Sequence, residues 1–160
     1  MRHHAEGAIV ALVMTMQRGE SAAPGGAQIL LVEDVLEQRE PVTEILRARG
    51  YEVTIAVDGG AAVREAGKRG FDVIIMDIAL PVMDGIEAIR RIRAAAAAAR
   101  DGKRPHVIVL SAQVDARTRE LAFEAGCDQF MIKPCSLDAI ASAVGAYLAK
   151  RDGIKTPLTV

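Results

Sequence analysis

Aromatic residues, cysteines and net charge are all scarce in this chain. It has no tryptophan and only three phenylalanines and two tyrosines, so a core must be built largely from aliphatic side chains. Its two cysteines, Cys127 and Cys135, have neither metal-ligand spacing nor a disulfide framework around them, which favours reduced thiols in the cytoplasm. Lysines and arginines number 20 against 21 aspartates and glutamates, a net charge of -1, which argues against broad electrostatic binding of nucleic acid.

Long hydrophobic runs are also missing. No stretch approaches the roughly 18 apolar residues of a membrane span, so no membrane partner is expected. The one short candidate for a targeting segment, AIVALVM at 8–14, lies between Glu6 and QRGE, flanks that disfavour a secretion signal. SAAPGG at 21–26 has the composition of a linker. We therefore predict an N-terminal extension or linker at 1–26, a single domain at 27–150, a tail at 151–160, and a cytoplasmic location.

Strand and helix patterns alternate along the predicted domain. Strand patterns occupy 28–34, 51–60, 71–77, 106–112 and 128–134, and helix patterns 37–50, 61–70, 85–100, 115–126 and 136–151. With right-handed crossovers, this alternation predicts an α/β fold with a doubly wound, five-stranded parallel sheet and five helices on both faces, a three-layer sandwich. The expected strand order is the flavodoxin-like 2-1-3-4-5.

The third strand pattern ends on an unexpected residue. The segment 72–85 reads DVIIMDIALPVMDG, in which four apolar residues typical of a strand buried on both faces run directly into Asp77. An isolated aspartate at such a position is more often a turn former. The residues that end the other strands decide between a turn and a functional carboxylate.

Polar side chains end four of the five predicted strands. Glu33 and Asp34 end the first, Asp77 the third, Ser111 lies near the end of the fourth, and Lys133 ends the fifth. In a doubly wound sheet these ends lie at the edge that binds ligands. Three carboxylates gathered there repel one another and need a cation, and an all-oxygen site with water suits Mg²⁺. Lys133 and Ser111 would hold the oxygens of a tetrahedral anion. A cation site and an anion clamp around one carboxylate together indicate phosphoryl transfer onto Asp77.

Four separated motifs in the same order resemble those of the response-regulator receiver domain (CheY-like) of two-component signalling, over roughly 28–150. LLVED resembles the family's acidic pair, MDIALPVMDG its phosphoacceptor segment, VLSA the end of its fourth strand, and FMIKP its strand-5 lysine and the proline that follows in a typically cis bond. The resemblance implies phosphoryl transfer from a phosphohistidine of a histidine kinase or histidine phosphotransfer protein. It also implies a switch rather than a turnover enzyme.

The resemblance also assigns metal ligands. Asp34 would bind Mg²⁺ directly and Glu33 mainly through water, while Asp77 and the backbone carbonyl of Ala79 would complete the protein ligands, and Mn²⁺ could substitute.

A switch pair follows from the same resemblance. Ser111 would move to the phosphoryl group and Phe130 would follow inward. This movement would change the surface of the fourth helix, fifth strand and fifth helix, with which the family contacts downstream proteins.

Two departures from the family pattern concern its variable positions and its third helix. Ala79 and Gln113 stand where the family tunes the lifetime of the phosphoryl group. The alanines at 94–99 lengthen the third helix, and we expect a protruding helix end there, as tolerated length rather than as a docking element.

Several polar residues have structural interpretations that we prefer. Asp84 is expected to cap the third helix, and Asp58 to be a turn residue. Arg90, Arg91 and Arg93 are expected to form a solvated helix face.

Three other functions share some of these features. A haloacid-dehalogenase-type phosphatase would need an acid at position 79, and a dinucleotide binder would need glycines after the first strand, where the sequence reads VEDVLEQ. The remaining alternative is a pseudo-receiver that binds protein constitutively without phosphorylation. About ten residues follow Lys150, so we expect output through protein contact, either as a single-domain regulator or as part of a hybrid kinase.

Overall fold

The computed structural model describes residues 26–154, so the predictions for almost all of the extension and for the end of the tail lie outside the described residues. Strands and helices alternate throughout this range. They are β1 (Gln28–Val32), α2 (Leu36–Ala48), β2 (Glu52–Ala56), α3 (Gly59–Lys68), β3 (Val73–Asp77), α4 (Gly85–Ala98), β4 (His106–Ser111), α5 (Ala116–Ala125), β5 (Gln129–Ile132) and α6 (Leu137–Arg151).

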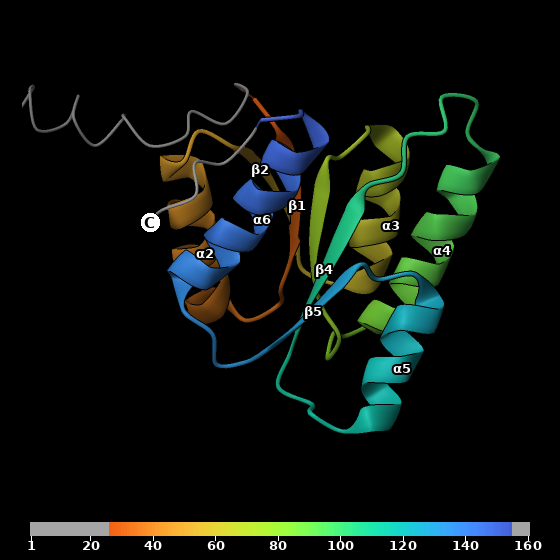
Figure 1. The fold of residues 1–160 in the computed structure, drawn as a ribbon. Coiled ribbons are helices and arrows are strands. Elements are labelled where there is room, and N and C mark those ends of the chain that lie inside the picture. Colours follow the sequence, from red (N-terminus) through yellow and green to blue (C-terminus); the bar gives the residue numbers. More distant parts are fainter. Residues whose placement is uncertain (1–25, 155–160) are drawn as a thin grey trace, which may run out of the picture.

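The five strands form one parallel sheet in the order β2-β1-β3-β4-β5. Helices α2 and α6 lie together on one face of the sheet, and α3, α4 and α5 cover the other (Figure 1). The predicted three-layer α/β fold and its strand order are therefore confirmed. Because β3 lies between β1 and β4 and helices cover both faces of the sheet, all five of its residues are buried, as the apolar run before Asp77 indicated.

Alternate residues along the strands feed two separate cores, because successive side chains in a strand point to opposite faces. The core under α3, α4 and α5 includes Leu30, Val32, Ile74, Met76, Val107 and Val109. The core under α2 and α6 includes Ile29, Leu31, Val73, Ile75, Ile108 and Leu110. Aliphatic side chains thus dominate both cores, as the composition required.

The N-cap predicted for α4 is observed, and one helix, α3, begins more than one residue away from its predicted start. Asp84 caps α4 by accepting a hydrogen bond from the backbone N–H three residues on, as predicted, and Ser136 caps α6 in the same way. Asp58 does the same for α3, at 2.6 Å from the nitrogen of Ala61, so this helix begins at Gly59, two residues before the predicted start. Asp58 is therefore an N-cap rather than only a turn residue.

The prediction of a solvated arginine face is wrong for one of its three members. Arg90 and Arg91 are exposed and pair with an acid of the same helix. Arg93, however, has a side chain only 13% exposed, and it turns toward the connection between α5 and β5. There its guanidinium donates to the carbonyl of Gly126 at 2.8 Å and to Asp128 at 2.7 Å. It faces inward because a cluster of acceptors from distant segments lies beneath α4.

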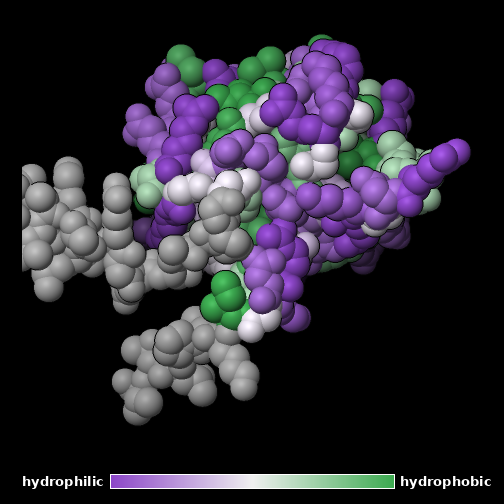
Figure 2. Space-filling model, turned by 90° about the horizontal axis from the view of Figure 1, so that it is seen from above, coloured by the Kyte–Doolittle hydropathy of each residue, from purple (hydrophilic) through white to green (hydrophobic). Residues whose placement is uncertain are grey.

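The edge at which the strands begin carries mostly hydrophilic side chains, with hydrophobic residues between them (Figure 2). Asp72, just before β3, accepts from Arg151 at the end of α6 at 2.6 Å and lies 3.2 Å from the ammonium of Lys103. At the same edge, α4 ends at Ala98, two residues before the predicted end, and leads into a loop that extends beyond α3 (Figure 1).

Candidate functional site

Three carboxylates meet at the opposite edge, where the strands end. Glu33 and Asp34 follow β1, Asp77 ends β3, and β1 pairs with β3 in register. One oxygen from each carboxylate lies within 4.8 Å of the others. Glu33 and Asp77 are buried, whereas Asp34 is exposed. The convergence predicted from the strand ends is therefore confirmed.

The surroundings of Asp77 act on its charge in opposite directions. Burial raises the pKa of its carboxyl, the nearby Lys133 ammonium lowers it, and the negative charge of Glu33 raises it again. The backbone N–H of Ala79 donates to Oδ1 at 3.3 Å and also favours the ionised form. The balance is a pKa above the ordinary value, which is typical of a carboxylate withdrawn from water at a functional site.

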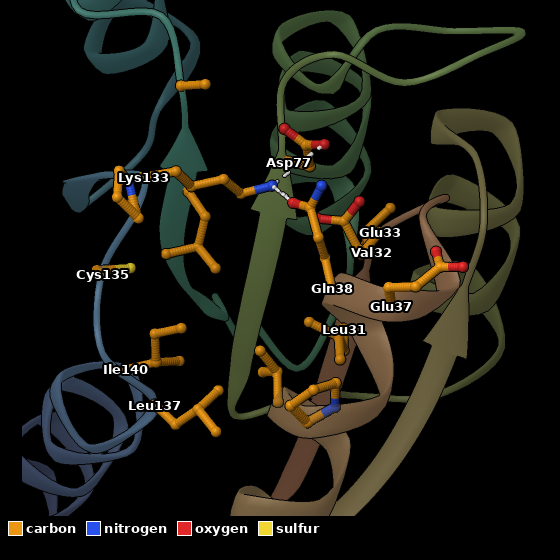
Figure 3. Close-up of a pocket in the computed structure, with 15 residues that line it drawn as sticks. Leu31, Val32, Glu33, Glu37, Gln38, Asp77, Lys133, Cys135, Leu137 and Ile140 are labelled. Carbon is orange, nitrogen blue, oxygen red and sulfur yellow. Dashed lines mark hydrogen bonds and ion pairs between the residues drawn. The ribbon is translucent and has the colours of Figure 1, made fainter.

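Lys133 joins this cluster from the end of β5. Its Nζ lies 2.7 Å from Oε2 of Glu33 and 3.6 Å from Oδ2 of Asp77 (Figure 3). It also donates to Oε1 of Gln38 on α2 at 2.8 Å. The Lys133–Pro134 peptide is cis, the geometry that the family resemblance implied. Gln38 was not singled out from the sequence, because no motif marks it.

Ser111 and Phe130 occupy the neighbouring strands. Ser111 ends β4, is 2% exposed, and its hydroxyl accepts from the N–H of Gln113 at 3.0 Å. In the described part of the chain no hydrogen bond links it to Asp77. Phe130 lies half-buried on β5 against the core under α3, α4 and α5, with the guanidinium of Arg119 6.0 Å from its ring centre. Their proposed switching roles stay predictions.

The loop after Asp77 is held close to the sheet by Gly85. A Cβ atom at this position would overlap the backbone carbonyl oxygen of Asp77, so a side chain there would push the loop away from the site. Ala79, predicted to offer its carbonyl to a metal, is exposed in the same loop.

The donor atoms fit a hard divalent cation. All three side chains in the cluster offer carboxylate oxygens, and none offers nitrogen or sulfur. Two of them are buried close together, where their mutual repulsion favours a bound cation. Oxygen donors that leave part of the coordination sphere to water suit Mg²⁺.

A pocket of about 460 Å³ opens beside the cluster, between α2 and α6. Its polar lining consists of Glu33, Glu37, Gln38, Asp77 and Lys133. The rest of its lining is largely apolar and includes Leu31, Val42, Leu110, Leu137 and Ile140. The lysine therefore lies at a boundary between the acidic cluster and open space (Figure 3).

Fold and site together define a class, the CheY-like doubly wound domains with a carboxylate cluster at the carboxyl edge of the sheet. A family model described as the response regulator receiver domain matches residues 29–145. The chain therefore belongs to the receiver domain family of two-component systems. A receiver domain is a signalling module rather than a turnover enzyme, as expected from the motifs.

Curated transcriptional regulators are similar in sequence to this chain. The transcriptional regulatory protein PrrA of Mycobacterium tuberculosis is 35% identical over 129 residues, which cover 81% of this chain and 53% of PrrA. The chain thus spans about half the length of the curated relatives that it matches.

Solved receiver-domain structures are also similar to this chain, and two of them illustrate the match. One is the receiver domain of the sensor histidine kinase PA1611 from Pseudomonas aeruginosa, solved with a magnesium ion coordinated in its active-site cleft. It is 34% identical, with a TM-score of 0.68, and the match covers 78% of this chain and 99% of that one. The chemotaxis protein CheY4 of Vibrio cholerae is 28% identical, with a TM-score of 0.69 over 77% of this chain and 99% of its own. Within residues 26–154, no helix has both the length and the apolar character of a membrane span.

Proposed function

We propose that the domain accepts a phosphoryl group on Asp77 from a phosphohistidine of a histidine kinase or histidine phosphotransfer protein. The observation that carries this proposal is that the carboxylates of Glu33 and Asp34 and the ammonium of Lys133 lie around the buried carboxylate of Asp77. Membership of the receiver family and the coordinated magnesium in the PA1611 receiver support it.

In the proposed step, a carboxylate oxygen of Asp77 attacks phosphorus while the bond from phosphorus to the imidazole nitrogen breaks. The imidazole keeps the electron pair of that bond and takes a proton from solvent. Lys133 would hold one phosphoryl oxygen and the hydroxyl of Ser111 would donate to another. Packing of β3 on both faces keeps the attacking carboxylate in place, so that the domain contributes mainly position and charge.

The metal would be held by Asp34 directly, by Glu33 mainly through water, and by Asp77 and the carbonyl of Ala79. Magnesium, or manganese in its place, would neutralise charge on the phosphoryl oxygens when bound.

Modification would be read out by protein contact. Ser111 would move toward the phosphoryl group, Phe130 would follow inward, and the surface of α5, β5 and α6 would change for a downstream protein. The cytoplasm is the proposed compartment, which agrees with the two free cysteines.

Intact-mass spectrometry after incubation with acetyl phosphate or phosphoramidate tests the proposal. The protein should gain one phosphoryl group in the presence of Mg²⁺, but not with EDTA and not in Asp77→Asn. A folded protein that stays unmodified under every condition would contradict the proposal and favour the pseudo-receiver, a module that binds its partner constitutively.

A further inference from the structure

Gln38 makes a contact that the proposed phosphoryl transfer does not use. It lies in the first turn of α2, and its side-chain oxygen accepts a hydrogen bond from Lys133, 95 residues away in sequence, at 2.8 Å. The amide and the ammonium meet across the mouth of the pocket between α2 and the end of β5 (Figure 3). This contact links a surface helix directly to the lysine of the site.

The lysine is directed away from Asp77 by its two shorter contacts. An ammonium has three protons to donate. Nζ of Lys133 lies at hydrogen-bond distance from Glu33, at 2.7 Å, and from Gln38, at 2.8 Å. Its 3.6 Å separation from Asp77 is too long for a hydrogen bond. Glu33 and Gln38 therefore hold the ammonium short of the carboxylate on which the phosphoryl group would form.

We infer that Gln38 is a positioning residue that restrains Lys133 in the unmodified domain and slows its transfer to a phosphoryl oxygen. This inference rests on the proposed function of Asp77. An interaction that is present before the reaction and lost in the transition state raises the barrier. The ammonium must leave the amide in order to reach a phosphoryl oxygen beside Asp77. The pocket leaves open space around the two side chains for this movement.

Two substitutions at position 38 should change the rate in opposite directions. Gln38→Met keeps the length of the side chain and removes the acceptor, so phosphorylation should become about three- to tenfold faster, the effect of losing one hydrogen bond that solvent weakens because it is exposed. Gln38→Glu strengthens the acceptor with a charge, and phosphorylation should become slower by a similar factor. A merely structural role for Gln38 would move both variants in the same direction.

The assay measures initial rates with phosphoramidate at saturating Mg²⁺ by intact mass. Glu44→Met is the matched control, because it places the same side chain at an exposed position of α2 where the described part of the chain shows no hydrogen bond or ion pair. Its rate should equal that of the wild type. A rate for Gln38→Met that equals or falls below the wild-type rate would overturn the inference.

A second readout does not depend on phosphorylation. Hydrogen exchange of the Lys133 ammonium protons, followed by NMR in the unmodified protein, should be faster in Gln38→Met than in the wild type, because a hydrogen-bonded ammonium is protected. Unchanged exchange would refute the restraint even if Asp77 proved unreactive. If the wild type is not phosphorylated at all, the proposed function fails, whereas a phosphorylated wild type with unresponsive variants refutes only the role of Gln38.

Discussion

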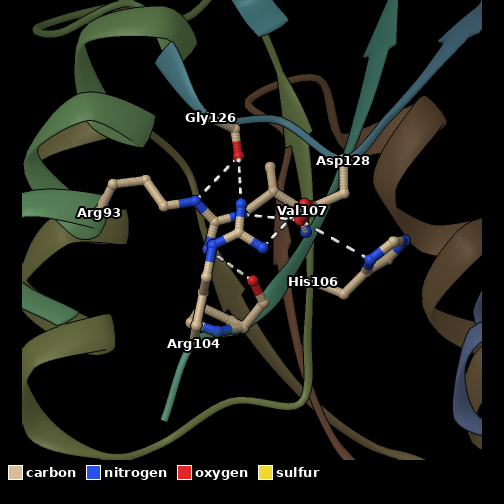
Figure 4. Close-up of polar contacts among 7 residues, drawn as sticks. Arg93, Arg104, His106, Val107, Gly126 and Asp128 are labelled. Carbon is tan, nitrogen blue, oxygen red and sulfur yellow. Dashed lines mark hydrogen bonds and ion pairs between the residues drawn. The ribbon is translucent and has the colours of Figure 1, made fainter. Parts of the chain in front are cut away.

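Replacing Arg93 with methionine should destabilise the domain far more than the same change at a neighbouring arginine. The guanidinium of Arg93 donates to the carbonyls of Pro105 and Gly126 at 2.6 and 2.8 Å, and to Asp128 at 2.7 Å (Figure 4). These acceptors lie just before β4 and just before β5, so one side chain joins α4 to two other segments. Methionine can occupy the space of the aliphatic stem but cannot donate.

The expected loss of unfolding free energy depends on whether each acceptor of Arg93 keeps another hydrogen-bond donor. Each hydrogen bond from a charged donor contributes about 1.5–3 kcal/mol net. Arg104 still donates to Asp128 at 2.8 Å and to Gly126 at 3.4 Å, so only part of this energy is lost at those two acceptors. Burial lowers the pKa of Arg93, which shows that desolvation offsets some of the gain. We therefore expect Arg93→Met to reduce the free energy of unfolding by about 2–3 kcal/mol.

Urea denaturation followed by circular dichroism measures this loss, since the chain has no tryptophan for fluorescence. Arg91→Met is the control: this exposed arginine pairs with Glu87 on the same helix at 2.8 Å, a contact that contributes about 0.3–0.5 kcal/mol. Equal losses in the two variants, or a loss at Arg93 below about 1 kcal/mol, would refute the assigned role of the buried guanidinium.

Three further changes follow from backbone strain, burial and steric contact. Val82 is 89% exposed and has a φ of 67°, a backbone conformation that is strained for valine. Val82→Gly should raise the free energy of unfolding by about 0.5–1 kcal/mol in urea titrations, because it relieves about 1–2 kcal/mol of backbone strain but adds conformational entropy to the unfolded chain. A gain no larger than that of Val114→Gly, in another exposed loop, would contradict this. Burial lowers the pKa of His106 from 6.5, so below pH 6.5 the unfolded chain binds a proton that the folded chain lacks, and stability should fall as the pH drops through this range. His106→Phe, which can keep the stacking on the neighbouring tyrosine, should flatten that part of the profile, and an unchanged slope would disprove the assignment. Gly85→Ala should lower the free energy of unfolding by about 1–3 kcal/mol, because the added Cβ overlaps the last carbonyl oxygen of β3. Gly67→Ala, with open space around it, should not lower it. Equal urea midpoints for the two variants would count against the overlap.

The sequence predicted the features that depend on local pattern and on sheet geometry. The apolar run before Asp77 required a central strand, and parallel strands bring their ends to one edge, so Glu33, Asp34 and Lys133 could be placed beside it. Asp84 was predictable as a cap because capping involves residues only three apart.

Contacts between distant segments could not be predicted in this way. Arg93 fits a solvated helix face by periodicity, and its inward direction depends on acceptors as far as 35 residues away in sequence. Gln38 meets Lys133 across 95 residues. The early start of α3 was missed because Gly59 and Gly60 have poor helix propensity, whereas the capping aspartate and tertiary packing stabilise the helix there.

Identifying the residue that carries the phosphoryl group is the decisive test of phosphorylation on Asp77. After treatment with phosphoramidate and Mg²⁺, borohydride reduction converts an aspartyl phosphate to homoserine, which peptide mass spectrometry places in the sequence. We predict homoserine at position 77 in the wild type and none in Asp77→Asn. Homoserine at Asp34 or Asp84 instead, or a modified protein without homoserine at position 77, would contradict it.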